Sequence, residues 1–342
     1  MSLMPLPAQP ADVPWPTQAW PTGDLPPGLD RARFDNLLSQ AFDTDDMGET
    51  HALAIVQGGK LVFERYGPRH GPDHTYPSWS KAKSITQALI GVLVGEGRLD
   101  IHAPADVPEW REPGDPRAAI TLDQLLRMSS GLRFVEDYVP EHPSDVIEML
   151  QRSGRPDMAH FAASMPLEHA PGTFWSYASG TTNIVSRIAA RAIGATGEDF
   201  HAFMRRALFE PLGMTRPVPK FDGVGTFIGS SYCFATARDF ARFGLLYLRG
   251  GMWDGAQLLP EGWVDYARTP TFQQPGADEN RYGAHWWLDV GGPGSFSANG
   301  YDGQYTVLAP DLDLILVRHG ATPLAKKDVL KAWVGQTVAA FR

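Results

Sequence analysis

Two overlapping Ser-x-x-Lys patterns occur in the stretch PSWSKAKSIT, residues 77–86. Ser78 precedes Lys81 by three residues, and Ser80 precedes Lys83 by the same spacing. In a helix this spacing places both side chains on one face, so the lysine can take a proton from the serine hydroxyl. Such a pair is a nucleophile with its base for acyl transfer without histidine. Because roughly one chance match is expected in a chain of this length, the pattern needs support from its surroundings.

The surroundings of the two pairs favour the second one. From residue 80 to about 96 the sequence predicts a helix that is apolar almost all round and therefore buried. The helix dipole at its start favours a developing oxyanion, and burial lowers the pKa of a lysine there. The more internal lysine is the one expected to lose solvent, which favours Ser80 with Lys83. Ser78 and Lys81 are interpreted as solvated residues at the helix entrance.

Several other chemistries have no support in the sequence. It contains no Gly-x-Ser-x-Gly elbow, no Walker A loop and no Gly-x-Gly-x-x-Gly after a strand. The nearest approach to a metal cluster is HGPDH, residues 70–74, which lacks the His-x-His or His-Glu-x-x-His spacing of zinc enzymes. His70 and His74 are therefore interpreted as loop residues, and we expect no metal site.

Composition restricts the partners and the compartment. The 342 residues carry a net charge of -9 and a pI near 5.6, which disfavours nucleic acid and anionic membrane surfaces. The single cysteine, Cys233, cannot form an internal disulfide. No run of about 18 apolar residues predicts a membrane span, and the N-terminus does not resemble a signal peptide. We expect a cytoplasmic protein with no membrane partner; its oligomeric state is not readable.

The predicted elements define an α+β fold. Residues 1–29 form a proline-rich strap, and a helix begins after Asp30. Two strands joined by Gly58-Gly59 follow, strand patterns return after about residue 280, and a last helix shows Val329, Leu330, Trp333, Val334 and Val338 on one face.

The strands therefore lie near both ends of the chain, with helix signals between them. We predict one catalytic unit over 30–342, in which 30–79 and 280–342 form an antiparallel sheet flanked by helices and 80–279 form a large helical insert. Within the insert, Thr121 and Gln124 predict a capping box, and Thr236 predicts the start of a helix over 237–249.

Longer motifs then connect the chain to a known family. SKAKSITQALIG with Ser80 and Lys83, followed by PGTFWSYAS around Tyr177, resembles the serine β-lactamases and penicillin-binding proteins. The similarity covers roughly residues 30–340, includes ITLDQLLRMSSGL and RYGAHWWL, and is greatest to the class C β-lactamase and esterase branch, especially the 6-aminohexanoate-dimer hydrolases. It implies a β-lactamase-like fold, a general-base role for Tyr177 beside Lys83 with a lowered phenol pKa, and a substrate-side hydrogen bond from Ser179.

The third motif of that family departs from its usual form. Where β-lactamases have Lys-Thr-Gly on a strand, SANGYDGQYTVLAP has Tyr301-Asp302-Gly303. The resemblance implies that Gly303 and Tyr301 border the substrate, and that the backbone N–H of Gln304 joins that of Ser80 as an oxyanion donor. The missing lysine disfavours β-lactamase or D,D-peptidase activity, and Arg318 is a possible substitute charge.

The sequence thus predicts a serine hydrolase that acts on a small ester or amide, including short amide oligomers, without metal or organic cofactor. Two alternatives stay open: a β-lactamase or D,D-peptidase, and a catalytically silent binding protein with this fold. Four tryptophans could form an apolar wall of the substrate pocket: Trp79, Trp175, Trp286 and Trp287.

Overall fold

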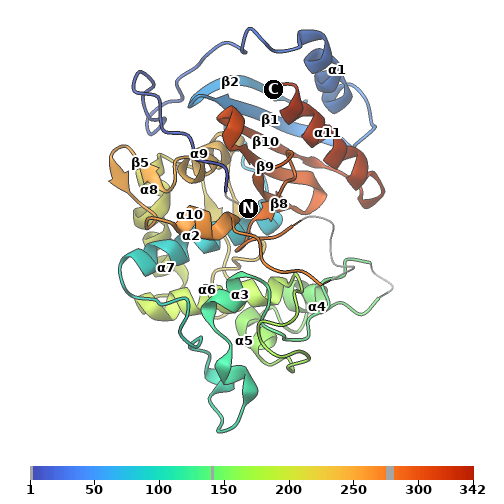
Figure 1. Cartoon of the computed structure of the whole chain (residues 1–342). Helices are drawn as coiled ribbons and strands as arrows, with labels where there is room; N and C mark the ends of the chain where they lie inside the picture. Colours follow the sequence, from blue (N-terminus) through green and yellow to red (C-terminus); the bar gives the residue numbers. More distant parts are fainter. Residues whose placement is uncertain (1–2, 140–141, 275–280) are drawn as a thin grey trace.

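The computed structural model of the chain describes residues 3–139, 142–274 and 281–342. Its centre is an antiparallel sheet of six strands in the order β2-β1-β10-β9-β8-β7 (Figure 1). The first two strands come from the N-terminal part of the chain and the other four from its C-terminal part. Their bounds are β1 Glu49–Gln57, β2 Lys60–Tyr66, β7 Trp287–Leu288, β8 Phe296–Gly300, β9 Gln304–Ala309 and β10 Leu314–Ala321.

The N- and C-terminal strands meet in the pairing of β1 with β10, where Ile55 lies opposite Leu316. The predicted hairpin turn lies between β1 and β2. Gly58 and Gly59 have φ values of 57° and 74°, the left-handed conformations that a two-residue hairpin turn requires. The predicted α+β class and the antiparallel sheet are confirmed.

Helices cover both faces of this sheet (Figure 1). α1 (Arg31–Phe42) and α11 (Lys327–Ala339) pack on one face, where Phe34 and Trp333 join the inward side chains of the strands in one apolar cluster. α2 (Ala82–Gly95) and α9 (Ala237–Leu248) pack against the opposite face. Five apolar residues were predicted to lie on one face of the last helix. Four of them are buried, and Val329 is exposed.

The helical part below the sheet in Figure 1 contains short elements joined by long loops. The predicted capping boxes at Thr121 and Thr236 are both present. The helices are α3 Leu122–Leu126, α4 Asp145–Gln151, α5 Met158–Ala163, α6 Ser179–Ile193, α7 Gly197–Met204 with a π-helical turn Arg205–Phe209, α8 Glu210–Leu212 and α10 Trp263–Arg268. Two small hairpins accompany them: β3 Val218–Pro219 with β4 Cys233–Phe234, and β5 Met252–Trp253 with β6 Ala256–Gln257.

The described part of the N-terminal strap lies against the body of the protein. Thr22 forms a parallel bridge with Leu61 of β2, and the Trp253 indole N–H donates a hydrogen bond of 2.8 Å to Thr17 Oγ1. In the described ranges, no helix combines the length and the apolar character that crossing a membrane requires.

The strand predicted for RYGAHWWLDV is mostly irregular. Only Trp287–Leu288 pairs in the sheet, while a bridge between Tyr282 and Trp287 closes a tight turn in which His285 has a φ of 59°. A left-handed residue in the middle of the segment interrupts an extended strand.

Candidate active site

Ser80 and Lys83 lie where the short 3-10 turn Trp79–Lys81 leads into α2. The Lys83 Nζ lies 3.0 Å from Ser80 Oγ, within hydrogen-bond distance. Trp79, directly before the serine, has a φ of 43°, a conformation that costs a non-glycine residue about 1–3 kcal/mol. Strain of this kind is common where the backbone presents a reactive side chain.

Ser78 and Lys81 are fully buried, so the interpretation of this pair as solvated was wrong. The Ser78 hydroxyl donates to the Ser231 carbonyl and accepts a hydrogen bond from the Cys233 N–H at 2.9 Å. The Lys81 Nζ lies 3.5 Å from the centre of the Phe240 ring. The reason is tertiary: the 3-10 turn packs against β8 and β9, which remove it from solvent.

Lys83 is buried in a cage of oxygen atoms. Its Nζ lies 3.0 Å from Ser179 Oγ and 3.0 Å from the Ser230 carbonyl, in addition to Ser80 Oγ. Burial lowers the pKa of Lys83 to about 8, against the opposing effect of the Glu136 charge. A neutral amine can donate to Ser179 and Ser230 while its lone pair accepts the Ser80 proton. The cage therefore suits a general base that is partly neutral near physiological pH.

Glu136, in the loop before α4, is a residue that the sequence analysis missed. Its carboxylate accepts hydrogen bonds from the Ser179 N–H at 2.7 Å, the Ser179 hydroxyl at 2.6 Å and the Tyr138 hydroxyl at 2.8 Å. It thereby holds Ser179 against Lys83. Nothing in the local pattern FVEDY indicated this role, because Ser179 lies 43 positions further along the chain.

Tyr177 lies just before α6 and completes the group around Ser80. The Lys83 Nζ lies 4.7 Å from the centre of its ring, and both Tyr177 and Ser80 line the same pocket. Burial raises the pKa of Tyr177 well above its usual value; the Glu136 charge adds to this, and the nearby Ser80 side chain opposes it. The expected lowering of this pKa was therefore wrong. A neutral phenol can carry a proton between oxygen atoms, but it is a poor phenolate base.

A pocket of about 360 Å³ opens in front of Ser80. Its inner wall carries Ser80, Tyr177 and Glu136, which come from three segments far apart in the sequence. Half of the other lining residues are aromatic or charged: Tyr138, Trp287, Tyr301, Tyr305, Asp137, Asp302, Lys327 and Lys331.

The segment Tyr301–Gly303 forms one edge of this pocket, as the motif predicted. The Tyr301 ring packs against Tyr138 with centres 5.0 Å apart. Gly303 has a φ of 79°, and a Cβ there would lie 2.3 Å from Leu330 Cδ2 and 2.5 Å from Arg318 Nη1. Glycine is thus needed for packing behind the turn as well as for the pocket surface.

Arg318 does not provide the substitute charge. Its side chain is fully buried beneath the turn and donates to the carbonyls of Asp302 and Gly303. Burial lowers the pKa of Arg318 to about 10. The guanidinium therefore supports the backbone of the turn and does not line the pocket.

Gln304 begins β9 directly after this turn, and its side chain is locked. The amide Nε2 donates to the Gly320 carbonyl at 2.6 Å, while Oε1 lies 2.9 Å from His319 Nδ1. At the neighbouring strand end, a Cβ on Gly300 would lie 2.3 Å from the Ser78 carbonyl. This close approach fixes β8 and β9 beside the Ser80 turn; the oxyanion role of the Gln304 N–H stays a prediction.

The predictions for three of the four tryptophans were wrong. Trp79 does not line the pocket, and its ring packs against Tyr232 and Tyr301. Trp286 is fully buried and packs with its ring centre 4.4 Å from that of Tyr247, within the core. Trp175 lies behind the pocket wall, against Tyr282 and Trp287. Of the consecutive residues Trp286 and Trp287, Trp287 lines the pocket and Trp286 does not, because consecutive residues in an extended chain point to opposite sides.

Taken together, the sheet and the helical part define a β-lactamase-like fold, in which a buried lysine contacts a partly exposed serine. The family model described as Beta-lactamase matches residues 40–334, and the chain belongs to this family.

Relatives in the family act on different bonds. The chain is 26% identical over 312 residues to the 6-aminohexanoate-dimer hydrolase of Paenarthrobacter ureafaciens, covering 85% of this chain and 78% of that protein. It is 28% identical over 206 residues to Esterase EstB of Burkholderia gladioli, covering 54% of this chain and 50% of that one. Among solved structures, a penicillin-binding protein homologue from Caulobacter crescentus matches with a TM-score of 0.70 at 21% identity, covering 94% and 99%.

The contact of Glu136 with Ser179 predicts an effect on pH dependence. The Glu136→Gln substitution keeps an oxygen for the Ser179 N–H but removes the charge that raises the pKa of Lys83. Because the base must be neutral to act, the acid limb of kcat/KM for an ester should move to lower pH than in the unaltered protein. Measurement of the pH–rate profile between pH 5 and 9 checks this. An unshifted limb with only a lower plateau would assign Glu136 a purely structural role.

Proposed function

We propose that this protein hydrolyses small carboxylic esters or amides through an acyl-enzyme on Ser80. The observation that carries the proposal is the buried Lys83 amine, which contacts the Ser80 hydroxyl and has a pKa of about 8. A scaffold that only binds ligands has no need for a buried lysine held against a partly exposed serine. Burying such a group is costly unless it has a use.

The proposed reaction follows from this arrangement. Lys83 takes the Ser80 proton as Oγ attacks the carbonyl carbon, and the N–H groups of Ser80 and Gln304 receive the resulting oxyanion. Tyr177, which is neutral and lines the pocket with Ser80, passes the proton from Lys83 to the leaving alcohol or amine. Water then attacks the acyl-enzyme, with Lys83 again as the base, and releases the acid and Ser80. None of these steps calls for a metal or an organic cofactor.

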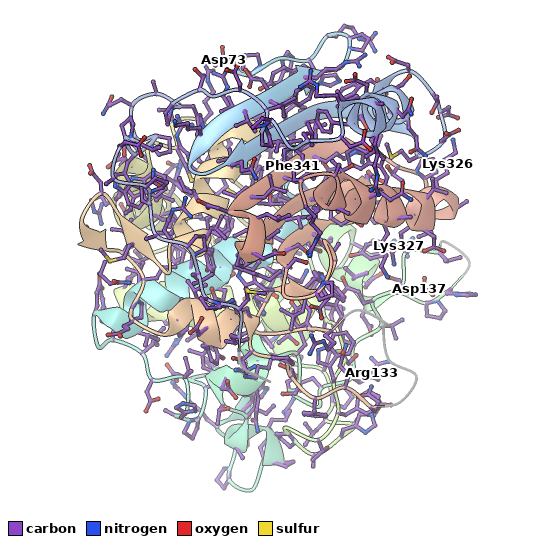
Figure 2. The ribbon with its side chains drawn as sticks, turned by 45° about the horizontal axis from the view of Figure 1, so that its top comes forward. Asp73, Arg133, Asp137, Lys326, Lys327 and Phe341 are labelled. Carbon is purple, nitrogen blue, oxygen red and sulfur yellow. The ribbon has the colours of Figure 1, made fainter. Side chains whose placement is uncertain are left out.

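The charges in the pocket bear on the substrate. Tyr301 stands where β-lactamases have the lysine of Lys-Thr-Gly, so no cation lies at that strand position. Lys327 on α11 instead lines the outer part of the pocket, and Asp137 lines it from the loop before α4. Figure 2 labels both residues at the same edge of the molecule. A substrate with a carboxylate at the end remote from its scissile bond fits this arrangement better than a β-lactam does.

A substrate panel tests the proposal. For purified protein, kcat/KM for nitrophenyl esters of short acids should be at least about 10³-fold higher than for a chromogenic cephalosporin. The kcat/KM for a linear dimer of an ω-amino acid should lie between these two values. Efficient cephalosporin hydrolysis would instead support the β-lactamase alternative. No turnover of any ester or amide in the panel, by folded protein, would support the silent binding protein.

The Lys327→Ala variant refines this test. KM for a nitrophenyl hemi-ester of a dicarboxylic acid should rise several-fold, because one exposed ion pair contributes about 0.2–1 kcal/mol, while KM for the matching neutral ester stays unchanged. Lys326 is the matched control: it contacts Asp45 and does not line the pocket. Equal KM changes for the acidic and neutral esters would remove Lys327 from substrate recognition.

A further inference from the structure

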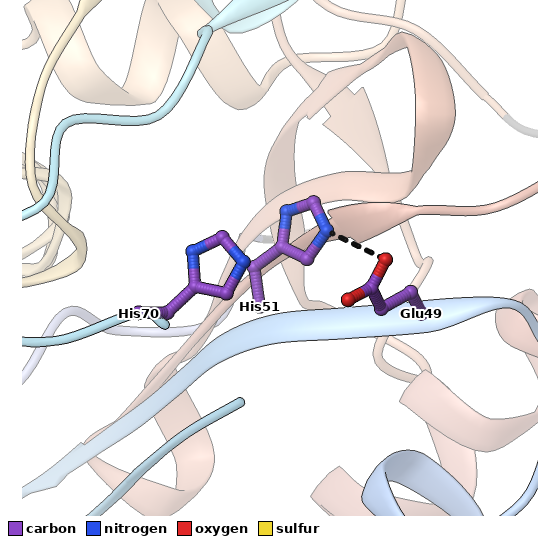
Figure 3. Close-up of side chains that lie close together, drawn as sticks. All are labelled: Glu49, His51 and His70. Atoms are coloured by element: carbon purple, nitrogen blue, oxygen red, sulfur yellow. Dashed lines mark ion pairs between the residues drawn. The ribbon is translucent and has the colours of Figure 1, made fainter. Parts of the chain in front are cut away.

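Two histidines and a glutamate come together outside the catalytic pocket. Glu49 and His51 belong to the start of β1, and His70 belongs to the loop that follows β2. One ligand atom from each of the three residues lies within 4.8 Å of those of the other two. Figure 3 shows both imidazole rings side by side, with the Glu49 carboxylate beyond His51. None of the three residues lines the pocket in front of Ser80.

The backbone brings the three residues together in a specific way. The pairing of β1 with β10 skips His51, which is the extra residue of a β-bulge between Thr50 and Ala52. A bulge re-aims a side chain relative to a regular strand. The His51 carbonyl accepts a hydrogen bond of 2.9 Å from the Gly67 N–H, and the His70 N–H donates to the Gly67 carbonyl at 3.1 Å. These bonds hold the turn that carries His70 against β1.

The turn also contains a residue in a costly conformation. Arg69, directly before His70, has a φ of 65°, in the left-handed region that favours glycine. The hydrogen bonds of the turn maintain this conformation, which sets the direction of the next side chain. The result is that the His70 ring lies 4.2 Å from the His51 ring, centre to centre, with 15° between the ring planes.

The chemistry of the three groups is that of a metal ligand set. The His70 Nδ1 is removed from solvent and has no hydrogen-bond partner among the described residues. Glu49 Oε2 lies 3.5 Å from His51 Nε2. Two imidazoles with one carboxylate are a ligand set that Zn²⁺ accepts, with a remaining position for water.

We propose that Glu49, His51 and His70 form a binding site for a zinc-type divalent cation that ties the loop after β2 to β1. A metal ion lies in the plane of each imidazole that binds it, so the stacked rings must turn about their side-chain bonds. His51 and His70 are both partly exposed, so metal binding requires a change of side-chain rotamer at the surface of the protein. The same loop continues to the Ser80 turn, so the metal would stabilise the segment that leads to the nucleophile.

The spacing of the three residues explains why the sequence did not indicate the site. His70 and His74 alone have no zinc-enzyme spacing, and the nearer partner of His70 lies 19 positions earlier, at His51. The His74 ring, whose centre lies 5.6 Å from that of His70, is exposed and outside the set of three.

Calorimetric titration of untagged, chelator-treated protein with ZnCl₂ tests the proposal. We expect one saturable site per chain, a melting temperature that rises with zinc concentration, and affinity reduced about tenfold or more by His70→Ala or Glu49→Gln. His102→Ala, which removes an exposed histidine of the helical part, should bind as the unaltered protein does.

Two outcomes would overturn the site. One is the absence of saturable zinc binding by the unaltered protein. The other is equal zinc affinity in the unaltered protein and the two ligand variants. Circular dichroism of each metal-free variant separates loss of the site from loss of the fold. Because neither binding nor melting depends on turnover, this test is independent of the proposed hydrolase activity.

Discussion

Replacement of Ser80 by alanine should reduce kcat/KM for a nitrophenyl ester by about 10⁴-fold or more, to a rate near that of the buffer. In the proposed reaction the Ser80 hydroxyl oxygen forms the acyl-enzyme, and the described residues around it offer no second partly exposed serine in contact with Lys83. The fold should persist, because Ser80 is not part of the apolar core. Steady-state kinetics with circular dichroism of both proteins checks this result.

Ser78→Ala is the matched control for Ser80→Ala. Ser78 is buried and holds the Ser231 carbonyl and the Cys233 N–H, so its loss should lower the free energy of unfolding by about 1–3 kcal/mol. Turnover by the folded fraction should stay close to that of the unaltered protein. A fluorophosphonate probe followed by peptide mass spectrometry should find the label on Ser80. A label on Ser78, or full activity in Ser80→Ala, would refute the assignment.

Replacement of Lys83 by methionine should reduce kcat/KM by about 10³-fold, equivalent to about 4 kcal/mol of transition-state stabilisation. Methionine fills a similar volume but cannot accept the Ser80 proton. The residual rate should also lose the acid limb that we expect near pH 8 for the unaltered protein, because this limb would report the ionisation of Lys83. Rates measured from pH 5 to 9 check both effects.

Lys81→Met provides the control that the chain itself offers, since Lys81 is an equally buried lysine two residues earlier. Burial lowers the pKa of Lys81 well below its usual value, and its Nζ contacts His319 and Phe240, with no serine partner among the described residues. Replacing a buried lysine on an aromatic ring by an apolar side chain should change stability little and keep kcat/KM within about tenfold. Equal losses in Lys81→Met and Lys83→Met would contradict the distinct role of Lys83.

Local patterns were sufficient for most elements of the fold. Gly58-Gly59 between alternating strands, Asp30 before a periodic helix and the two threonine caps each specify an element through neighbouring residues. The change of pattern after about residue 280 placed strands at both ends of the chain, from which the antiparallel sheet followed. Where these local signals were weak, as in RYGAHWWLDV, the left-handed residues His285 and Asp289 interrupt the predicted strand.

For the candidate site, the sequence by itself determined the order and spacing of the motifs around Ser80, Tyr177 and Tyr301. Burial was decided only by the tertiary structure. Helix periodicity predicted a buried Lys83, but it did not predict that side chains of α9 and β10 also cover Lys81. The charge of Glu136 reaches Lys83 and Tyr177 across a separation in sequence that no local pattern encodes.

The same distinction explains the outer histidines. A pKa or a ligand set depends on which atoms lie within a few ångströms, and those atoms come from segments brought together by the whole sheet. The sequence therefore indicated the β-lactamase family and predicted Ser80 as the nucleophile. Only the packing of distant strands and loops decided the direction in which the pKa of Tyr177 moves. The same packing decided that the His51 ring lies against the His70 ring.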